Sequence, residues 1–192
     1  MSYNIFITSD THFGHANMCK FLDYSGNRVR PFDNYEECDE LMVQNWNKVV
    51  RPEDKVYFLG DFSMKRTEAD KVISRLHGKK CLIKGNHDIF KPNWYLKWFY
   101  DIRGAYNFES FLMTHVPVHP DSKARFKMNL HGHIHTGCVI DSDGQPDVWY
   151  RNVCMDANNY ELIPFEQIQH EFSVYKQQGK IILPPKLERT FN

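Results

Sequence analysis

The chain has 192 residues, of which 42% are hydrophobic and 25% charged, and its formal net charge at pH 7 is zero. This length suits one domain with a sizeable core, so we expect a single domain over residues 1–192. The composition favours a globular protein over a disordered one, and the neutral charge removes the bulk electrostatic case for nucleic-acid binding. We therefore expect no stable binding of duplex nucleic acid, whereas the oligomeric state stays open.

The first residues, "MSYNIFITSD", do not resemble a signal peptide, and no stretch approaches the length needed to cross a bilayer. We therefore expect a cytoplasmic protein with no membrane partner. The cysteines are odd in number and lack Cys-x-x-Cys spacing, so reduced and mostly buried thiols are favoured over disulfides or a thiolate metal site. They are Cys19, Cys38, Cys81, Cys138 and Cys154.

The first elements in chain order are a strand and a helix. Residues 3–8, "YNIFIT", are β-branched and aromatic and stop at the polar "SDTHFGH", which predicts a buried strand ending in functional groups. Apolar residues then recur at helical spacing between positions 38 and 50. Asn34 is a suitable N-cap for this helix, and Glu37 three residues later completes a capping box.

Strands and helices continue to alternate through the first half. "KVYFLGDF", residues 55–62, predicts a second buried strand, and "KKCLIKGNHD", residues 79–88, predicts a third. Between them, "TEADKVISRLHG" predicts a helix that begins near Thr67 and stops at Gly78, a natural left-handed terminator. Each strand of this half ends in a polar cluster.

The second half is richer in strands. Residues 89–109 are aromatic and irregular, and three short strands follow in "SFLMTHVP", "KMNLHGHIH" and "VWYRNVCMDA". Residues 165–179 predict a closing helix, and the tail 180–192 is too rich in proline to continue it.

Potential metal ligands follow the β-like runs in five separate places. In an extended segment residues i and i+2 project to the same side, so an Asp-x-His or His-x-His pair can offer two ligands to one cavity. Carboxylate, amide and imidazole ligands without thiolate suit Mn, Fe, Zn or Ni. The five places are Asp10 with His12, Asp61, Asn86 with His87 and Asp88, His115, and His133 with His135.

A ligand set of this size is more economically explained by two ions than by one. A pair of ions roughly 3.5 to 4 Å apart can hold both oxygens of an in-line phosphoryl displacement. The residues alone therefore favour hydrolysis of a phosphoester.

The ordered motifs "SDTH", "LGDF", "GNHD", "MTHVP" and "HGHIH" resemble those of the calcineurin-like metallophosphoesterase family over residues 5 to about 156. The short chain, "SDTHFGH" and "YRNVCMDANNY" look most like its small stand-alone bacterial and phage members. The resemblance implies an α/β fold, a four-layer α/β/β/α sandwich with the site at strand ends. Met64 stands where many relatives have an aspartate, which leaves the supporting contacts of the site open.

The resemblance also implies roles for individual residues. His87 would face the scissile phosphate, stabilise its charge and protonate the leaving oxygen, and Asp88 would orient His87 or the local backbone. The nucleophile would be a hydroxide bridging two divalent ions, with Mn first in expectation and Fe, Zn or Ni as alternatives. Asp10, His12 and His135 would hold one ion, Asn86, His115 and His133 the other, and Asp61 would bridge both.

Several side chains have two readings at this point. His15 and Arg30 are candidate substrate contacts, and a solvated loop is the rival for each. His131 could satisfy a local backbone group instead of binding metal. The aromatic residues in 94–99 could stack a base, although packing in the core is favoured.

Three functions remain. The first is hydrolysis of a small phosphodiester or phosphomonoester, with a nucleotide among the candidate substrates. The second is a nuclease of the same chemistry acting on single-stranded or short nucleic acid. The third is a binding protein that has lost catalysis, which the complete ligand set disfavours.

Overall fold

The computed structural model describes residues 3–181, and its larger sheet has the strand order β4-β3-β2-β1-β9. The first four strands in this order are parallel to one another, and β9 runs antiparallel to β1 at the edge. The strands are β1 (Ile5–Thr8), β2 (Lys55–Phe58), β3 (Lys79–Ile83), β4 (Phe99–Arg103) and β9 (Ile163–Pro164). Since parallel strands end at one edge of a sheet, the loops that follow β1, β2 and β3 meet there.

The second sheet has the order β5-β6-β7-β8. Its strands β6, β7 and β8 are parallel, and β5 pairs antiparallel with β6. They are β5 (Ala105–Phe108), β6 (Phe111–Thr114), β7 (Met128–His131) and β8 (Tyr150–Asn152). The ends of β6 and β7 lead into the remaining ligand loops.

Alternation along β2 places the larger sheet between two apolar layers. Val56 and Phe58 belong to the core shared with the helices, whereas Tyr57 and Leu59 belong to the core shared with the second sheet. Successive side chains of a strand point to opposite faces, so a sheet buried on both faces reads as one continuous apolar run. The run "VYFL" therefore lies at the centre of the molecule.

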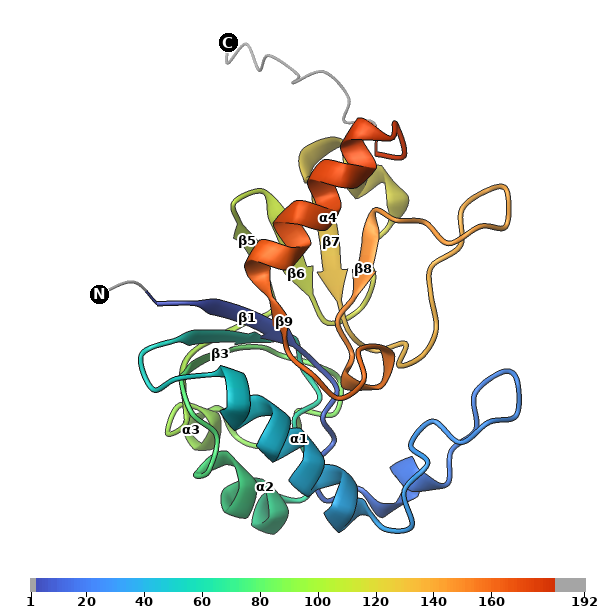
Figure 1. The fold of residues 1–192 in the computed structure, drawn as a ribbon. Coiled ribbons are helices and arrows are strands. Elements are labelled where there is room, and N and C mark those ends of the chain that lie inside the picture. The colour runs from blue at the N-terminus through green and yellow to red at the C-terminus, as the bar shows by residue number, and fades with distance from the viewer. Residues whose placement is uncertain (1–2, 182–192) are drawn as a thin grey trace.

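Helices cover the two sheets from outside, as Figure 1 shows. Met42 and Trp46 of α1 and Ala69 of α2 join the core on the larger sheet. Phe165 and Phe172 of α4 contact Phe111 of the second sheet through edge-on rings. The helices are α1 (Tyr35–Val49), α2 (Arg66–Ile73), α3 (Pro92–Tyr95) and α4 (Phe165–Gln177), with short 3-10 turns at Ala16–Cys19, Pro120–Arg125 and Met155–Ala157.

The predicted start of α1 is confirmed. The Asn34 side chain accepts the Glu37 N–H at 2.9 Å, but the Glu37 carboxylate accepts from the Asn34 side-chain amide at 2.8 Å, in place of the backbone N–H of a standard capping box. Helix α2 is shorter than predicted, because the chain tightens into turns after Ile73. Gly78 has the expected left-handed φ of +82°.

The stretch 89–109 is more regular than its sequence indicates. It contains α3, β4 and β5, and Trp94, Tyr95 and Phe99 are buried in the core. The core reading of the aromatic residues is thus confirmed for these three. The described part of the tail is limited to positions 180 and 181, so the prediction for 182–192 lies outside the described residues.

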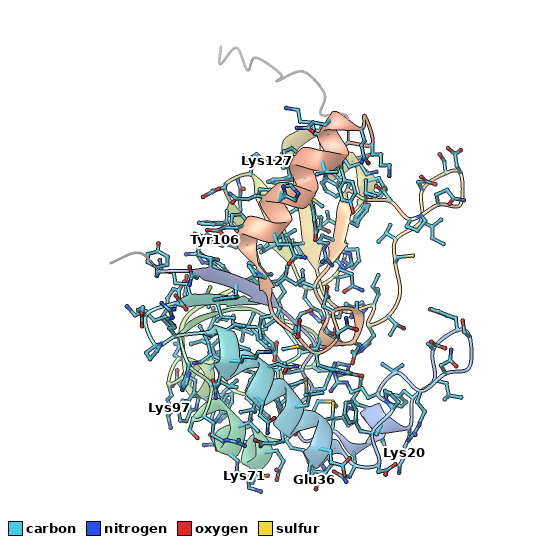
Figure 2. The ribbon with its side chains drawn as sticks, viewed as in Figure 1. Lys20, Glu36, Lys71, Lys97, Tyr106 and Lys127 are labelled. Carbon is cyan, nitrogen blue, oxygen red and sulfur yellow. The ribbon has the colours of Figure 1, made fainter. Side chains whose placement is uncertain are left out.

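The mixed α/β class with two sheets is confirmed, and so are the free cysteines, of which Cys138 alone is exposed. Within residues 3–181, no helix is both long and apolar enough to span a membrane. Figure 2 shows the labelled lysines Lys20, Lys71, Lys97 and Lys127 on separate parts of the surface, without a shared stripe.

Candidate metal centre

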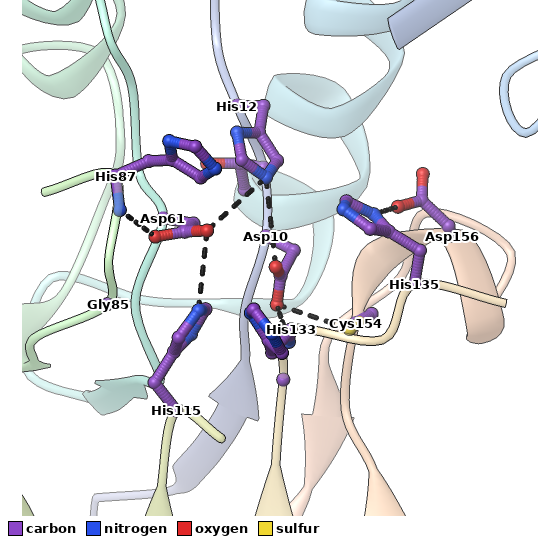
Figure 3. A network of polar contacts seen from close by, with 12 residues as sticks. Asp10, His12, Asp61, Gly85, His87, His115, His133, His135, Cys154 and Asp156 are labelled. Atoms are coloured by element: carbon purple, nitrogen blue, oxygen red, sulfur yellow. Dashed lines mark hydrogen bonds and ion pairs between the residues drawn. The ribbon is translucent and has the colours of Figure 1, made fainter. Parts of the chain in front are cut away.

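The ligand loops converge in space, as their places at strand ends predict. Loops from both sheets bring these side chains together in one network of polar contacts (Figure 3). Two groups of side chains, each within 4.8 Å by their ligand atoms, form there. We call Asp10, His12 and His135 the first cluster, and Asp61, His115 and His133 the second cluster.

Five of these ligands have a left-handed backbone conformation, and this conformation, not an extended one, sets the direction of their side chains. Non-glycine residues rarely adopt positive φ, and when they do the strain often marks a functional site. The extended i, i+2 geometry expected for Asp10 with His12, and for His133 with His135, is therefore wrong. The φ angles are 58° at Asp10, 47° at His12, 60° at Asp61, 73° at His133 and 48° at His135.

Two glycines let the loops approach one another closely. A Cβ on Gly132 would lie 2.2 Å from Oδ2 of Asp10, and a Cβ on Gly85 would lie 2.3 Å from Oδ1 of Asp61. No real side chain tolerates such distances, so glycine is required for backbone contact with these carboxylates. In "HGHIH", the glycine thus serves the packing of His133 against Asp10, whose Oδ2 accepts the His133 N–H at 2.9 Å.

The first cluster is the more deeply buried of the two. Asp10 and His12 are almost fully buried, with Oδ1 of Asp10 3.7 Å from Nε2 of His12. The His135 ring stacks 5.3 Å from the His12 ring, and its Nδ1 lies 2.6 Å from Oδ2 of Asp156. A carboxylate behind an imidazole fixes the ring and leaves its other nitrogen for a ligand.

The second cluster opens toward solvent. Nδ1 of His115 lies 2.7 Å from the Leu59 carbonyl oxygen, which leaves Nε2 facing the site. Oδ1 of Asn86 lies 2.8 Å from this Nε2 and 3.1 Å from Nδ1 of His133. Asn86 and His133 are exposed, and Asn86 lies against the second cluster, where the sequence predicts a ligand.

Asp61 lies between the clusters. Its Oδ2 is 3.6 Å from Nε2 of His12 and 3.3 Å from Nε2 of His115. Its Oδ1 accepts the His87 N–H at 2.8 Å. One carboxylate oxygen thus faces both clusters, the position that a bridging ligand requires.

The chemistry of these residues fits divalent metal ions. Ligand atoms sit about 2.1 Å from an ion, so two of them on one ion lie no more than about 4.2 Å apart. The pairs Asp10–His12 at 3.7 Å and Asp61–His115 at 3.3 Å meet this condition. Oδ1 of Asp10 and both ring nitrogens of His12 are buried without a hydrogen-bond partner. Buried polar atoms are rarely left unsatisfied, and metal coordination would satisfy them.

Mutual charge shifts the pKa values of the ligands. Burial works against a charged His115, but its hydrogen bond to Asp61 and the charges of Asp10 and Asp61 outweigh burial and raise its pKa to about 9. Burial likewise opposes charge on Asp10, yet the nearby histidines, His12 first, lower its pKa. A metal ion must therefore displace a proton from His115 below about pH 9.

His87 and His15 lie beside the first cluster without joining it. The His87 ring meets the His12 ring edge-on, with the ring centroids 5.5 Å apart. The His15 ring is tilted against the His12 ring, with the centroids 6.0 Å apart. His87 is half-buried, so its ring can reach both the ligands and solvent. These positions match the predicted places of an acid and of a substrate contact, whose roles stay predictions.

Asp88 acts on backbone and not on the His87 side chain. Its carboxylate accepts N–H groups from Gly85 at 2.8 Å, Asp61 at 2.9 Å and Phe62 at 3.0 Å. Burial raises the pKa of Asp88 despite these three donors. Of the two alternatives left by the sequence, the structure favours the backbone one, with Asp88 holding the loops after β2 and β3 together.

Arg30 does not face a substrate, so that prediction is corrected. The side chain is 1% exposed, and its donors bind the carbonyls of Thr11 at 2.7 Å and Asp10 at 2.6 Å. Its Nε donates to Oδ1 of Asp156 at 2.6 Å. A solvated loop is equally wrong, because Arg30 is a buried cation that holds the first cluster from behind.

Sequence reasoning missed the partner residues Asp156 and Cys154. Asp156 links Arg30 to His135, and the Cys154 thiol donates to Oδ2 of Asp10 at 3.1 Å. Both follow β8, so the rule that polar groups cluster after strand ends could have found them. His131, in contrast, bonds the Gly132 carbonyl, the local backbone contact that the sequence left as an alternative, and burial lowers its pKa to about 4.

Comparison with known proteins identifies relatives of this chain. The family model for calcineurin-like phosphoesterases matches residues 3–175. An uncharacterized protein of Methanocaldococcus jannaschii is 32% identical over 98% of this chain and 96% of its own length. The gene 66 protein of Mycobacterium phage L5 is 30% identical over 76% of this chain and 60% of its own length.

A solved structure supports the fold. The crystal structure of a protein of unknown function from Aquifex aeolicus superposes with a TM-score of 0.64 at 24% identity, covering 88% of this chain and 99% of that one. With the match of the family model over nearly the whole length, the chain belongs to the calcineurin-like phosphoesterase family. This family implies metal-dependent hydrolysis of phosphoesters, and the two clusters supply candidate ligands for it.

Proposed function

We propose that this protein hydrolyses a small phosphodiester or phosphomonoester with two divalent metal ions, Mn being the first candidate. The first cluster would hold one ion, and the second cluster with Asn86 would hold the other. Asp61 would serve both. When bound, the ions would supply an activated water and offset the negative charge of the phosphate.

The observation that carries the proposal is the position of Asp61 between two sets of ligand atoms. Its Oδ2 lies within 3.6 Å of imidazole nitrogens from both clusters, although those histidines follow different strands. A lone structural ion would need one such set. Two sets that share a carboxylate support a paired centre of the kind used in phosphoryl transfer.

The protein's own residues would do the remaining chemistry around the phosphate. The His87 N–H bond to Asp61 fixes the backbone of the acid candidate relative to the ligands, at 2.8 Å. From there, its imidazolium would stabilise the developing charge and donate a proton to the leaving oxygen. Asp88 would keep this loop in register through its three backbone contacts.

The test begins with metal-stripped protein to which Mn, Ni, Zn or Mg is returned singly. Hydrolysis of bis-p-nitrophenyl phosphate and of p-nitrophenyl phosphate then separates diesterase from monoesterase activity. We expect turnover that requires added metal. Absence of turnover with every metal would contradict the proposal.

His87→Ala tests the acid. Loss of a general acid typically costs about 100- to 10,000-fold in rate, so we expect a kcat reduced by this order with both ions still bound. His77→Ala is the matched control, since His77 lies outside the site and contacts the Val50 carbonyl. An emptied metal centre in His87→Ala would instead assign His87 to the ligands.

The nuclease alternative has less support. Its expected stacking platform, the aromatic stretch 94–99, has Trp94, Tyr95 and Phe99 buried in the core. Single-stranded nucleic acid is usually held by a cationic groove with stacked aromatic side chains. A small phosphorylated substrate is therefore the better proposal.

A further inference from the structure

Two hairpin loops flank the first cluster. One is closed by the bridge between Leu22 and Arg28, and the other by the bridge between Ile140 and Pro146. Figure 1 shows both loops projecting from the same side of the molecule. Each begins shortly after a predicted metal ligand, because the first follows the Asp10 loop and the second follows His135.

Both hairpins are held by the same local device. Oδ1 of Asp23 accepts the N–H groups of Ser25 and Asn27 at 2.9 Å each. Oδ1 of Asp141 accepts two N–H groups of its own turn at 2.9 Å each. Such side-chain turns order a loop without a partner element, so the hairpins are built structures.

Large apolar side chains on these hairpins face solvent. The exposed fractions are 48% for Phe21, 61% for Leu22, 105% for Tyr24 and 59% for Ile140. Single exposed apolar residues are ordinary, but a group around one hollow indicates a binding surface. Folding stability gains little from them, because they remain in water.

These side chains line two adjoining cavities of about 320 and 610 Å³. Tyr24, Ile134 and His135 line both cavities, and His133 lines the larger one. The hollow is therefore continuous with the candidate metal centre through two of its predicted ligands. A molecule with its phosphate at the clusters could extend directly between the hairpins.

The lining is nearly free of charge. Apart from the histidines, Asp23 carries the one formal charge among the described residues that line the two cavities, and its Oδ1 already serves the turn. A second phosphate or a carboxylate would find no cation there. An uncharged flat group could pack on the Tyr24 ring and against Ile140.

We infer that the hollow between the hairpins is a substrate subsite that binds a neutral aromatic group esterified to the phosphate, such as a nucleoside. The inference rests on the proposed function and names the class of its substrate. Tyr24 supplies the stacking face, and Ile134 and Ile140 supply apolar walls. The subsite binds a part of the substrate that does not react, and its contacts are the same in the ground state and the transition state, so it acts chiefly on KM.

The test compares two diesters with the same leaving group. Methyl p-nitrophenyl phosphate and thymidine 5′-(p-nitrophenyl phosphate) differ in the retained group alone, and both release p-nitrophenolate. We expect the wild-type protein to have a higher kcat/KM for the thymidine ester. In Tyr24→Ala and Ile140→Ser the ratio of the two kcat/KM values should fall about tenfold, mainly through KM, as expected for loss of a stacked base.

Tyr100→Ala is the matched control, because Tyr100 is a half-exposed tyrosine near the start of β4, away from the strand ends that carry the site. It should leave the ratio unchanged. A ratio that is equal in wild type and Tyr24→Ala, with the methyl ester still hydrolysed, would overturn the subsite alone. No hydrolysis of either diester, or of p-nitrophenyl phosphate, with any of the added metals would reject the proposed function itself.

The alternative occupant of the hollow is a second copy of the chain. Sedimentation of the same variants tests it by measuring their oligomeric state. If Tyr24→Ala changed the oligomeric state and left the ester ratio unchanged, the apolar hollow would be a contact between copies, and the subsite would be rejected. An unchanged oligomeric state with a reduced ratio is the expected result.

Discussion

The two clusters are built from similar ligands but are supported in different ways. Behind the first cluster stands an ion pair, with Arg30 bound to Asp156 and Asp156 bound to His135. Behind the second cluster stands a neutral backbone group, the Leu59 carbonyl that bonds His115. Both clusters have two buried members, but His135 of the first is half-buried, whereas His133 of the second and the adjoining Asn86 are exposed.

This difference predicts unequal metal affinities. A carboxylate behind an imidazole raises its basicity more than a carbonyl does, and burial keeps competing water away. We therefore expect the first cluster to bind its ion more tightly than the second. The exposed second ion would be the one that exchanges with the solvent.

The largest effect is expected from Asp61→Asn, which removes the charge shared by both clusters. Affinity for both ions should fall together, and turnover should drop by at least about 1,000-fold, because both ions contribute to the same phosphoryl transfer. Metal analysis and kcat measure the two effects. Asp33→Asn, at an exposed position, is the control. Loss of only one ion would show that Asp61 belongs to one cluster.

An intermediate effect is expected from Asp156→Asn, which disturbs the support of the first cluster. Loss of such a supporting partner typically lowers metal affinity about 10- to 100-fold. Calorimetric titration with metal should show weaker binding at the first cluster, the tighter site, and unchanged binding at the second cluster. Equal weakening of both steps would remove the contrast between the clusters. Stability should fall too, since Arg30 would be left buried without its ion pair.

The smallest effect concerns pH and the metal-free protein. The folded pKa of His115 is about 9, above the ordinary value of 6.5, so the protonated form stabilises the fold. This stabilisation is complete below about pH 6.5 and is lost as pH rises through 9, a change of about 1–3 kcal/mol. Denaturant unfolding at pH 6 and pH 9.5, compared with His115→Gln, measures it. A variant with the same pH dependence as the wild type would contradict the shift.

Much of the fold follows from local patterns in the sequence. The run of apolar residues in β2 and the cap at Asn34 required no knowledge of the rest of the chain, and both are confirmed. In contrast, β4 and β5 lie in a stretch without clear alternation. Their pairing depends on the neighbouring strands β3 and β6, which a local pattern does not contain.

The candidate site likewise has features that the sequence predicts and features that it does not. The ligands could be found because each follows a strand, and the structure brings the seven predicted ligands together. The role of Arg30 could not be found from the sequence, because its partner Asp156 lies 126 positions away. Nor does any local signal place non-glycine residues such as Asp10 and His133 in left-handed backbone, which the packing of the loops imposes.

The central claim is that two ions share Asp61. Titration of metal-free protein with Mn²⁺, followed by electron paramagnetic resonance, tests it most directly, because ions roughly 3.5 to 4 Å apart couple magnetically. The account predicts two ions bound per chain, in a tight and then a weaker step, with the spectrum of a coupled pair after the second. A spectrum of isolated Mn²⁺ at full occupancy, or binding that stops at one ion, would contradict it.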